Sequence, residues 1–175
     1  MQVTCTKFDA ASRQLDGAIK LLFADYDPLV IRTLTAAAHG LFADLVEHKH
    51  PDGSWRSHVL QDSGLSKKEL NSTQNYLKHA DRDPNTELSF DEEENDHLIF
   101  LATLECGELG GPLTLFMQAF QIWYLASYPE QLGTETEHVK KSRGELPSLE
   151  KLSREQRLSA GLAFLERERI AIATQ

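Results

Sequence analysis

Apolar residues recur at helical spacing along most of the chain. Leu15, Ile19 and Leu22 follow one another at intervals of three or four residues, the period of an amphipathic helix. Asp27 followed by Pro28 predicts a second helix start, because aspartate caps backbone amides and proline fits the first turn. No alternating run is long enough to predict a sheet. The pattern predicts helices at residues 12–25, 27–47, 66–78, 91–109, 112–128 and 153–169.

Two polar stretches separate these helices. Residues 48–66 contain the turn sequence Pro51-Asp52-Gly53, and residues 129–150 are rich in glycine, proline, lysine and glutamate, so we expect a connector and a loop. Helices joined in this way favour an all-α fold, an irregular bundle of five to six helices. A chain of 175 residues can bury a core, and we expect one domain over residues 1–175.

The expected helix at 112–128 is apolar over most of its circumference. A surface helix of a small bundle needs only one apolar face, so the remaining apolar residues must be covered by something else. A central place in the core would cover them, and so would a second subunit. We expect a homodimer that forms through this helix and buries Phe116, Phe120 or Trp123.

Composition and charge narrow the class of protein. The net charge of −9 argues against general nucleic-acid binding, which needs clustered lysine and arginine. Two cysteines are too few for a disulfide framework, and the first residues lack the apolar core of a signal peptide. No run of eighteen apolar residues predicts a membrane span. We therefore expect a cytoplasmic protein.

Residues 81–92 resemble the calcium loop of an EF-hand. Oxygen-bearing side chains stand at the ligand positions 1, 3, 5, 7, 9 and 12: Asp81, Asp83, Asn85, Glu87, Ser89 and Glu92. The turn chemistry departs from that motif, because Thr86 stands where glycine is needed and Pro84 stiffens the backbone before it. The alternative interpretation is an acidic turn between two helices, with its carboxylates near the positive end of the next helix.

Arg32 and His39 form a second candidate. They are seven residues apart and lie on one side of the same expected helix. This spacing resembles the Arg-x6-His motif of HEPN ribonucleases, which are small helical proteins, often dimeric. The resemblance implies that Arg32 would steady a scissile phosphate and that His39 would transfer a proton.

Over residues 15–105 the chain also resembles small all-helical bacterial proteins that are uncharacterised. The residues behind this likeness include Asp27-Pro28, Ala37-Ala38-His39 and Asn75-x-x-Lys78-His79-Ala80-Asp81-x-Asp83. The likeness implies a bacterial origin and a helical fold, and it transfers no activity. It also groups five polar residues, His39, Lys78, His79, Asp81 and Asp83. All of them except Lys78 are candidate ligands for a divalent metal.

Three hypotheses about function follow. The first, and the one we favour, is a noncatalytic helical binding or regulatory protein that self-associates. The second is a metal-binding protein or metalloenzyme that uses His39, His79 and Asp81. The third is a HEPN-like ribonuclease that uses Arg32 and His39.

Overall fold

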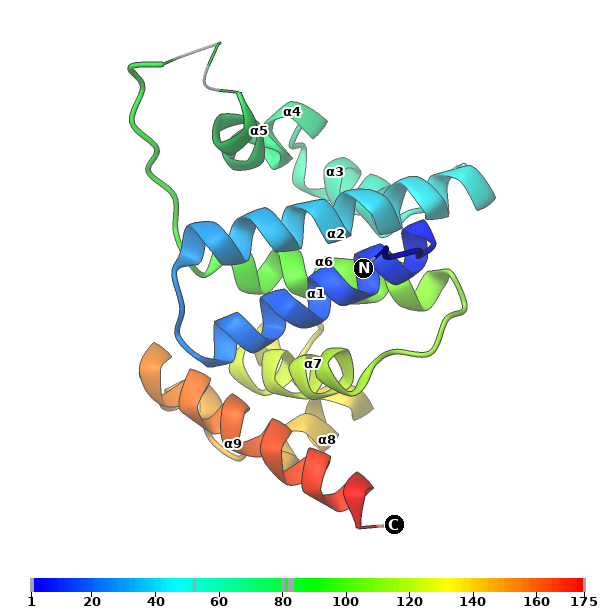
Figure 1. Cartoon of the computed structure of the whole chain (residues 1–175). Helices are drawn as coiled ribbons and strands as arrows, with labels where there is room; N and C mark the ends of the chain where they lie inside the picture. Colours follow the sequence, from blue (N-terminus) through cyan, green and yellow to red (C-terminus); the bar gives the residue numbers. More distant parts are fainter. Residues whose placement is uncertain (1, 52, 80, 82–83, 175) are drawn as a thin grey trace.

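The computed structural model describes residues 2–51, 53–79, 81 and 84–174. Within these residues the fold is entirely helical, with nine α-helices and two short 3-10 helices and no strand (Figure 1). The α-helices are α1 (Lys7–Phe23), α2 (Pro28–Lys49), α3 (Trp55–Ser63), α4 (Lys67–Leu70), α5 (Ser72–Lys78), α6 (Glu94–Glu108), α7 (Leu115–Ser127), α8 (Glu137–Glu145) and α9 (Arg154–Ala173). The 3-10 helices are η1 (Pro129–Gln131) and η2 (Leu149–Lys151).

The all-α prediction is confirmed, but five to six helices undercounts the bundle. The expected connector 48–66 contains α3, and the expected loop 129–150 contains α8. Both helices begin at side-chain caps, where Ser54 accepts a hydrogen bond from Ser57 N and Thr136 from Val139 N. Each buries only one or two residues, so neither shows the apolar periodicity on which the prediction relied.

The expected helix at 66–78 is divided into α4 and α5. The break falls at Asn71, whose side-chain amide donates to the carbonyl of Lys67, at 2.8 Å. Asparagine competes in this way with the regular helical hydrogen bonds, which favours a helix end. A capping box formed by Ser66 and Glu69 begins α4.

The helices form successive layers, which Figure 1 shows from top to bottom. Helices α3, α4 and α5 lie over α2, α1 and α6 follow, and α7 lies below them above α8 and α9. Phe23 of α1 meets Trp123 of α7 edge to face, with ring centroids 5.5 Å apart. The carbonyl of Arg157 in α9 accepts a hydrogen bond from Trp123 Nε1, at 2.6 Å. Three helices far apart in the sequence therefore meet at one indole.

Gly161 allows α9 to approach this indole closely. A Cβ atom there would lie 2.5 Å from Phe23 Cε1 and 2.9 Å from Trp123 Cδ1, closer than packed carbon atoms tolerate. The small residue is required by the packing of α9 against α1 and α7.

The apolar circumference of α7 is covered within one chain. Phe120 and Trp123 are fully buried among α1, α6, α8 and α9, and Phe116 is partly buried. The pattern that suggested a dimer is explained by a central place in the core. A homodimer stays a prediction, and Phe116 is the member of the expected set that retains exposed surface.

Helix α2 is long and apolar enough to cross a membrane by length and composition alone. Half of its apolar stretch is buried inside the fold, where it contacts α1 and α6. A core helix of a globular bundle meets the same criterion, so this finding is weak support for a membrane span.

Candidate functional site

A cavity of about 670 Å³ lies between α6 and the group α3–α5, here called the cover. Its lining is mostly apolar. The lining residues are Arg32, Trp55, Val59, Leu65, Glu69, Leu70, Ser72, Thr73, Ser89, Phe90, Glu94, His97, Leu98, Phe100, Leu101, Leu104, Tyr124, Gln131 and Leu132. A volume of this size lies within the usual range of small-molecule sites, roughly 300–1,000 Å³.

Helix α6 supplies the apolar wall of the cavity. Leu98, Leu101 and Leu104 follow one another at three-residue intervals and all line the cavity. Ile99 and Cys106 are fully buried in the main core on another face of the same helix. The apolar residues of α6 therefore have two locations: those on one face pack in the core, and those on another face line the cavity.

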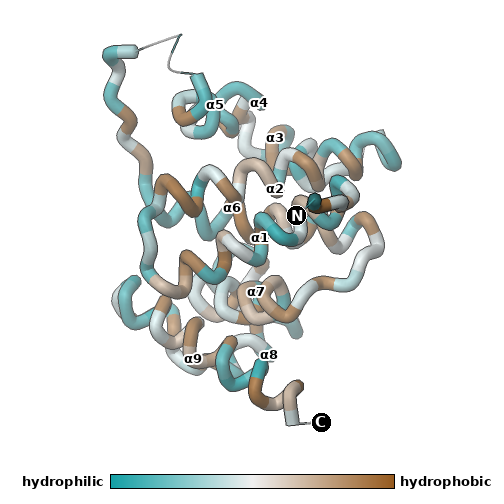
Figure 2. The backbone as a smooth tube through the Cα atoms, viewed as in Figure 1, coloured by the Kyte–Doolittle hydropathy of each residue, from teal (hydrophilic) through white to brown (hydrophobic). Residues whose placement is uncertain are grey.

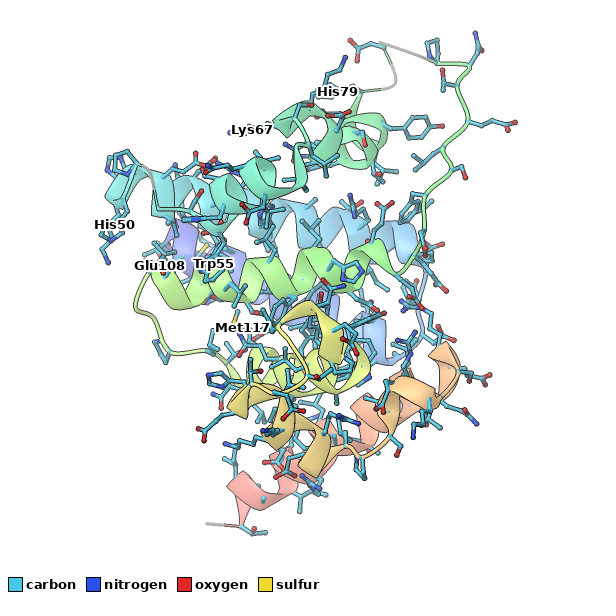
Figure 3. The ribbon with its side chains drawn as sticks, turned by 180° about the vertical axis from the view of Figure 1, so that it is seen from behind. His50, Trp55, Lys67, His79, Glu108 and Met117 are labelled. Atoms are coloured by element: carbon cyan, nitrogen blue, oxygen red, sulfur yellow. The ribbon has the colours of Figure 1, made fainter. Side chains whose placement is uncertain are left out.

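The side chains of the cover are mostly hydrophilic, and few of them are buried. Within α3, α4 and α5 the buried residues are Arg56 and Thr73, and Trp55 keeps 41% of its surface exposed. Figure 2 shows α4 and α5 mostly in the hydrophilic colour, whereas α7 is pale to brown. Figure 3, from behind, places Trp55 where α3 meets α6. The cover forms one side of the cavity, which is partly open to solvent, and it has no core of its own.

Polar interactions attach the cover to α2 and α6. The guanidinium of Arg56 is buried, and its Nη2 lies 2.8 Å from Asp44 Oδ1 and 2.7 Å from Glu47 Oε2. The backbone N–H of Arg56 donates to Glu105 Oε1, at 2.7 Å. Burial raises the pKa of the Glu105 carboxyl. The backbone amides of Arg56 and Trp55 at the start of α3 oppose this rise, because they favour the ionised carboxylate.

Arg32 is a buried charged residue in the cavity wall. It is 5% exposed, and its Nε has no hydrogen-bond partner within the described part of the chain. Its ion pair is with Glu94, at 3.6 Å, which is too long for a hydrogen bond. The Phe90 ring lies 5.9 Å from the guanidinium carbon. Burial lowers the pKa of Arg32, and the charge of Glu94 opposes the effect.

His97 and Tyr124 form a hydrogen-bonded pair at the same cavity. The imidazole Nδ1 and the phenol oxygen are 2.7 Å apart. Tyr124 is buried and stacks on Phe100 with ring centroids 4.1 Å apart, whereas His97 is exposed. Burial raises the pKa of the Tyr124 hydroxyl, so it is a neutral group that can donate to the imidazole.

His39 does not line the cavity. It is 2% exposed, and its Nε2 has no partner among the described residues. Burial, together with the nearby charges of Arg56 and Arg32, lowers its pKa from 6.5 to about 4. The imidazole is therefore neutral at pH 7 and closed to solvent. The two residues expected for a ribonuclease are both on α2, but only Arg32 reaches the cavity.

The expected metal ligands do not gather. Within the described residues no three His, Cys, Asp or Glu side chains form a group that could hold a metal ion, so His39, His79 and Asp81 are not brought together. His79 lies at the end of α5 (Figure 3), with its Nδ1 4.0 Å from Asp81 Oδ1. Asp83 lies outside the described residues. Of the calcium-loop ligands, Ser89 lines the cavity.

Most residues of this site were not predicted from the sequence. Trp55 stood in a stretch expected to be a connector, and Phe90 in an acidic turn. Glu94 and His97 have the Glu-x-x-His spacing of di-iron bundles, which chance explains as well. Both residues line the cavity. The sequence could show only that they are neighbours on one face of a helix, because they are three residues apart.

Comparison with known proteins gives no assignment. The chain matches no protein-family model, and it has no significant match to a curated protein or to a solved structure.

Proposed function

We propose that this protein binds a small, largely apolar molecule in the cavity between α6 and the cover. The proposal belongs to the class favoured from the sequence, a noncatalytic binding protein. It does not depend on a metal or on self-association.

The observation that carries the proposal is the apolar cavity itself. Leu98 and Leu101 of its wall, together with Val59 of α3 and Ala36 of α2, form a small apolar cluster apart from the main core. An apolar pocket with a few convergent polar groups is the usual form of a small-molecule site. The burial of His39 gives the ribonuclease alternative no comparable support.

Binding of a neutral fluorescent probe, N-phenyl-1-naphthylamine, tests the proposal. Its emission rises when it leaves water for an apolar site, and titration gives a Kd. Leu104→Trp places a larger side chain in the half-buried wall and should weaken binding at least about tenfold, because the added volume excludes the probe.

The matched control is Leu162→Trp, which makes the same change at a 37% exposed position on α9, outside the cavity. It should bind the probe as the wild type does. Thermal melts confirm that both variants fold. Equal affinity in the wild type and in Leu104→Trp would refute the proposed site.

A further inference from the structure

We propose that the preferred ligand is an amphipathic monocarboxylate, whose apolar chain or ring fills the cavity and whose carboxylate pairs with Arg32. This inference rests on the proposed function and adds the chemical class of the ligand.

Arg32 has hydrogen-bonding capacity that its neighbours do not satisfy. A guanidinium has five N–H donors in a planar fork that fits a carboxylate through two parallel hydrogen bonds. The Nε of Arg32 is buried and has no hydrogen-bond partner within the described residues, and the residue as a whole is 5% exposed. Burial of an unsatisfied charge costs free energy, so a ligand that satisfies this charge gains affinity from it.

The present partner of Arg32 can be displaced. Glu94 approaches at 3.6 Å, and its side chain is 49% exposed. A carboxylate half in water, at a distance too long for a hydrogen bond, contributes little, and it can turn toward solvent when another anion arrives.

The remaining charges of the cavity favour one negative charge on the ligand over two. Arg32 is the one lysine or arginine among the described lining residues, and Glu69 and Glu94 are the acidic ones. A dianionic phosphate would meet more repulsion from these carboxylates than a carboxylate would. The leucines of α6 and the ring of Phe90 suit the apolar part of the ligand.

Isothermal titration calorimetry with three ligands of one chain length tests the inference: dodecanoate and dodecyl phosphate, each below its micelle concentration, and 1-dodecanol below its solubility limit. The wild type should bind dodecanoate at least about tenfold more tightly than dodecanol, the effect of a charge-assisted pair. It should bind dodecyl phosphate more weakly than dodecanoate.

Arg32→Met removes the guanidinium and keeps the length of the side chain. It should lose the preference for dodecanoate and retain the affinity for dodecanol. Arg169→Met makes the same change at an exposed position of α9, away from the cavity, and should retain the preference. Glu94→Gln removes the competing charge and should tighten dodecanoate binding several-fold without affecting dodecanol.

The outcomes separate the two proposals. If the wild type binds neither dodecanoate nor dodecanol, the proposed function fails. If it binds both equally and Arg32→Met changes nothing, the cavity binds apolar molecules and the carboxylate inference is overturned. Tighter binding of dodecyl phosphate would identify a phosphate ligand and also overturn it. Should Arg32→Met not fold, the wild-type preference and Glu94→Gln still decide the question.

Discussion

The two tryptophans of the chain lie in two regions held together in different ways. Trp123 is fully buried where α1, α7 and α9 meet, in contact with aromatic rings and hydrogen-bonded to a carbonyl. Trp55 is 41% exposed at the start of the cover, whose attachment depends on the ion pairs of Arg56. One region is stabilised by extensive apolar burial, and the other by polar contacts and the small apolar cluster that includes Val59.

This difference has a consequence for dynamics. Local opening costs least where few apolar contacts must be broken, so the cover should open far more often than the α1–α7–α9 region. A cavity whose roof opens without loss of the core can admit a ligand and release it. The contrast thus supports the proposal that a ligand binds under the cover.

The largest expected effect comes from the indole in the core. Trp123→Ala should lower the free energy of unfolding by about 3–5 kcal/mol, because it leaves a cavity and removes the hydrogen bond from the indole to the carbonyl of Arg157. Trp55→Ala, the matched change in the cover, should cost less than about 1 kcal/mol. Urea denaturation followed by circular dichroism measures both, and similar losses would remove the distinction between the regions.

A smaller effect depends on pH and concerns α2, which contacts both α1 and α5. Burial lowers the pKa of His39 from 6.5 to about 4, so the unfolded chain binds this proton more tightly than the folded protein does. The contribution of neutral His39 is fully present above about pH 6.5 and is lost as the pH falls toward 4. The loss should approach about 3 kcal/mol.

Denaturation at a series of pH values between 7 and 4 tests this expectation. His39→Gln cannot be protonated and should flatten that part of the stability profile relative to the wild type. His138→Gln changes an exposed histidine of α8 and should keep the wild-type profile. Parallel profiles for wild type and His39→Gln would show that the buried imidazole does not titrate in this range.

An effect on global stability smaller than those at Trp123 and His39 is expected at the attachment of the cover. Arg56→Met removes the ion pairs to Asp44 and Glu47 but keeps the backbone hydrogen bond to Glu105, and should cost about 1–2 kcal/mol. Hydrogen exchange should accelerate in α3 and stay unchanged in α7. Acceleration in both helices would mean that cover and core unfold as one unit.

Sequence reasoning recovered the elements with strong periodicity. Helices α2, α6 and α7 were expected within a few residues of their observed bounds, because long apolar patterns and the Asp27 cap specify them locally. Helices α3 and α8 were missed, since a nine-residue helix that buries one or two side chains leaves no periodic signal.

For the candidate site residues, too, the sequence predicted the local arrangement but not the tertiary contacts. That Arg32 and His39 share one side of a helix followed from their spacing, and both are buried on α2. Whether either reaches a cavity did not follow, because this depends on what α3–α6 place opposite them. The segment 84–93 contributes Phe90 to the cavity wall beside Arg32, and no local rule predicts that meeting.

The sequence by itself determined that the protein is helical and that its most apolar helix must be buried on most of its faces. Local capping, turn residues and apolar period contain that information. Only the tertiary structure decided which helices pack around α7 and which distant residues come into contact. It also decided that α6 has one face in the core and another in a cavity. These are outcomes of long-range packing, in which the partner of a side chain is chosen by the whole fold and not by its neighbours in the chain.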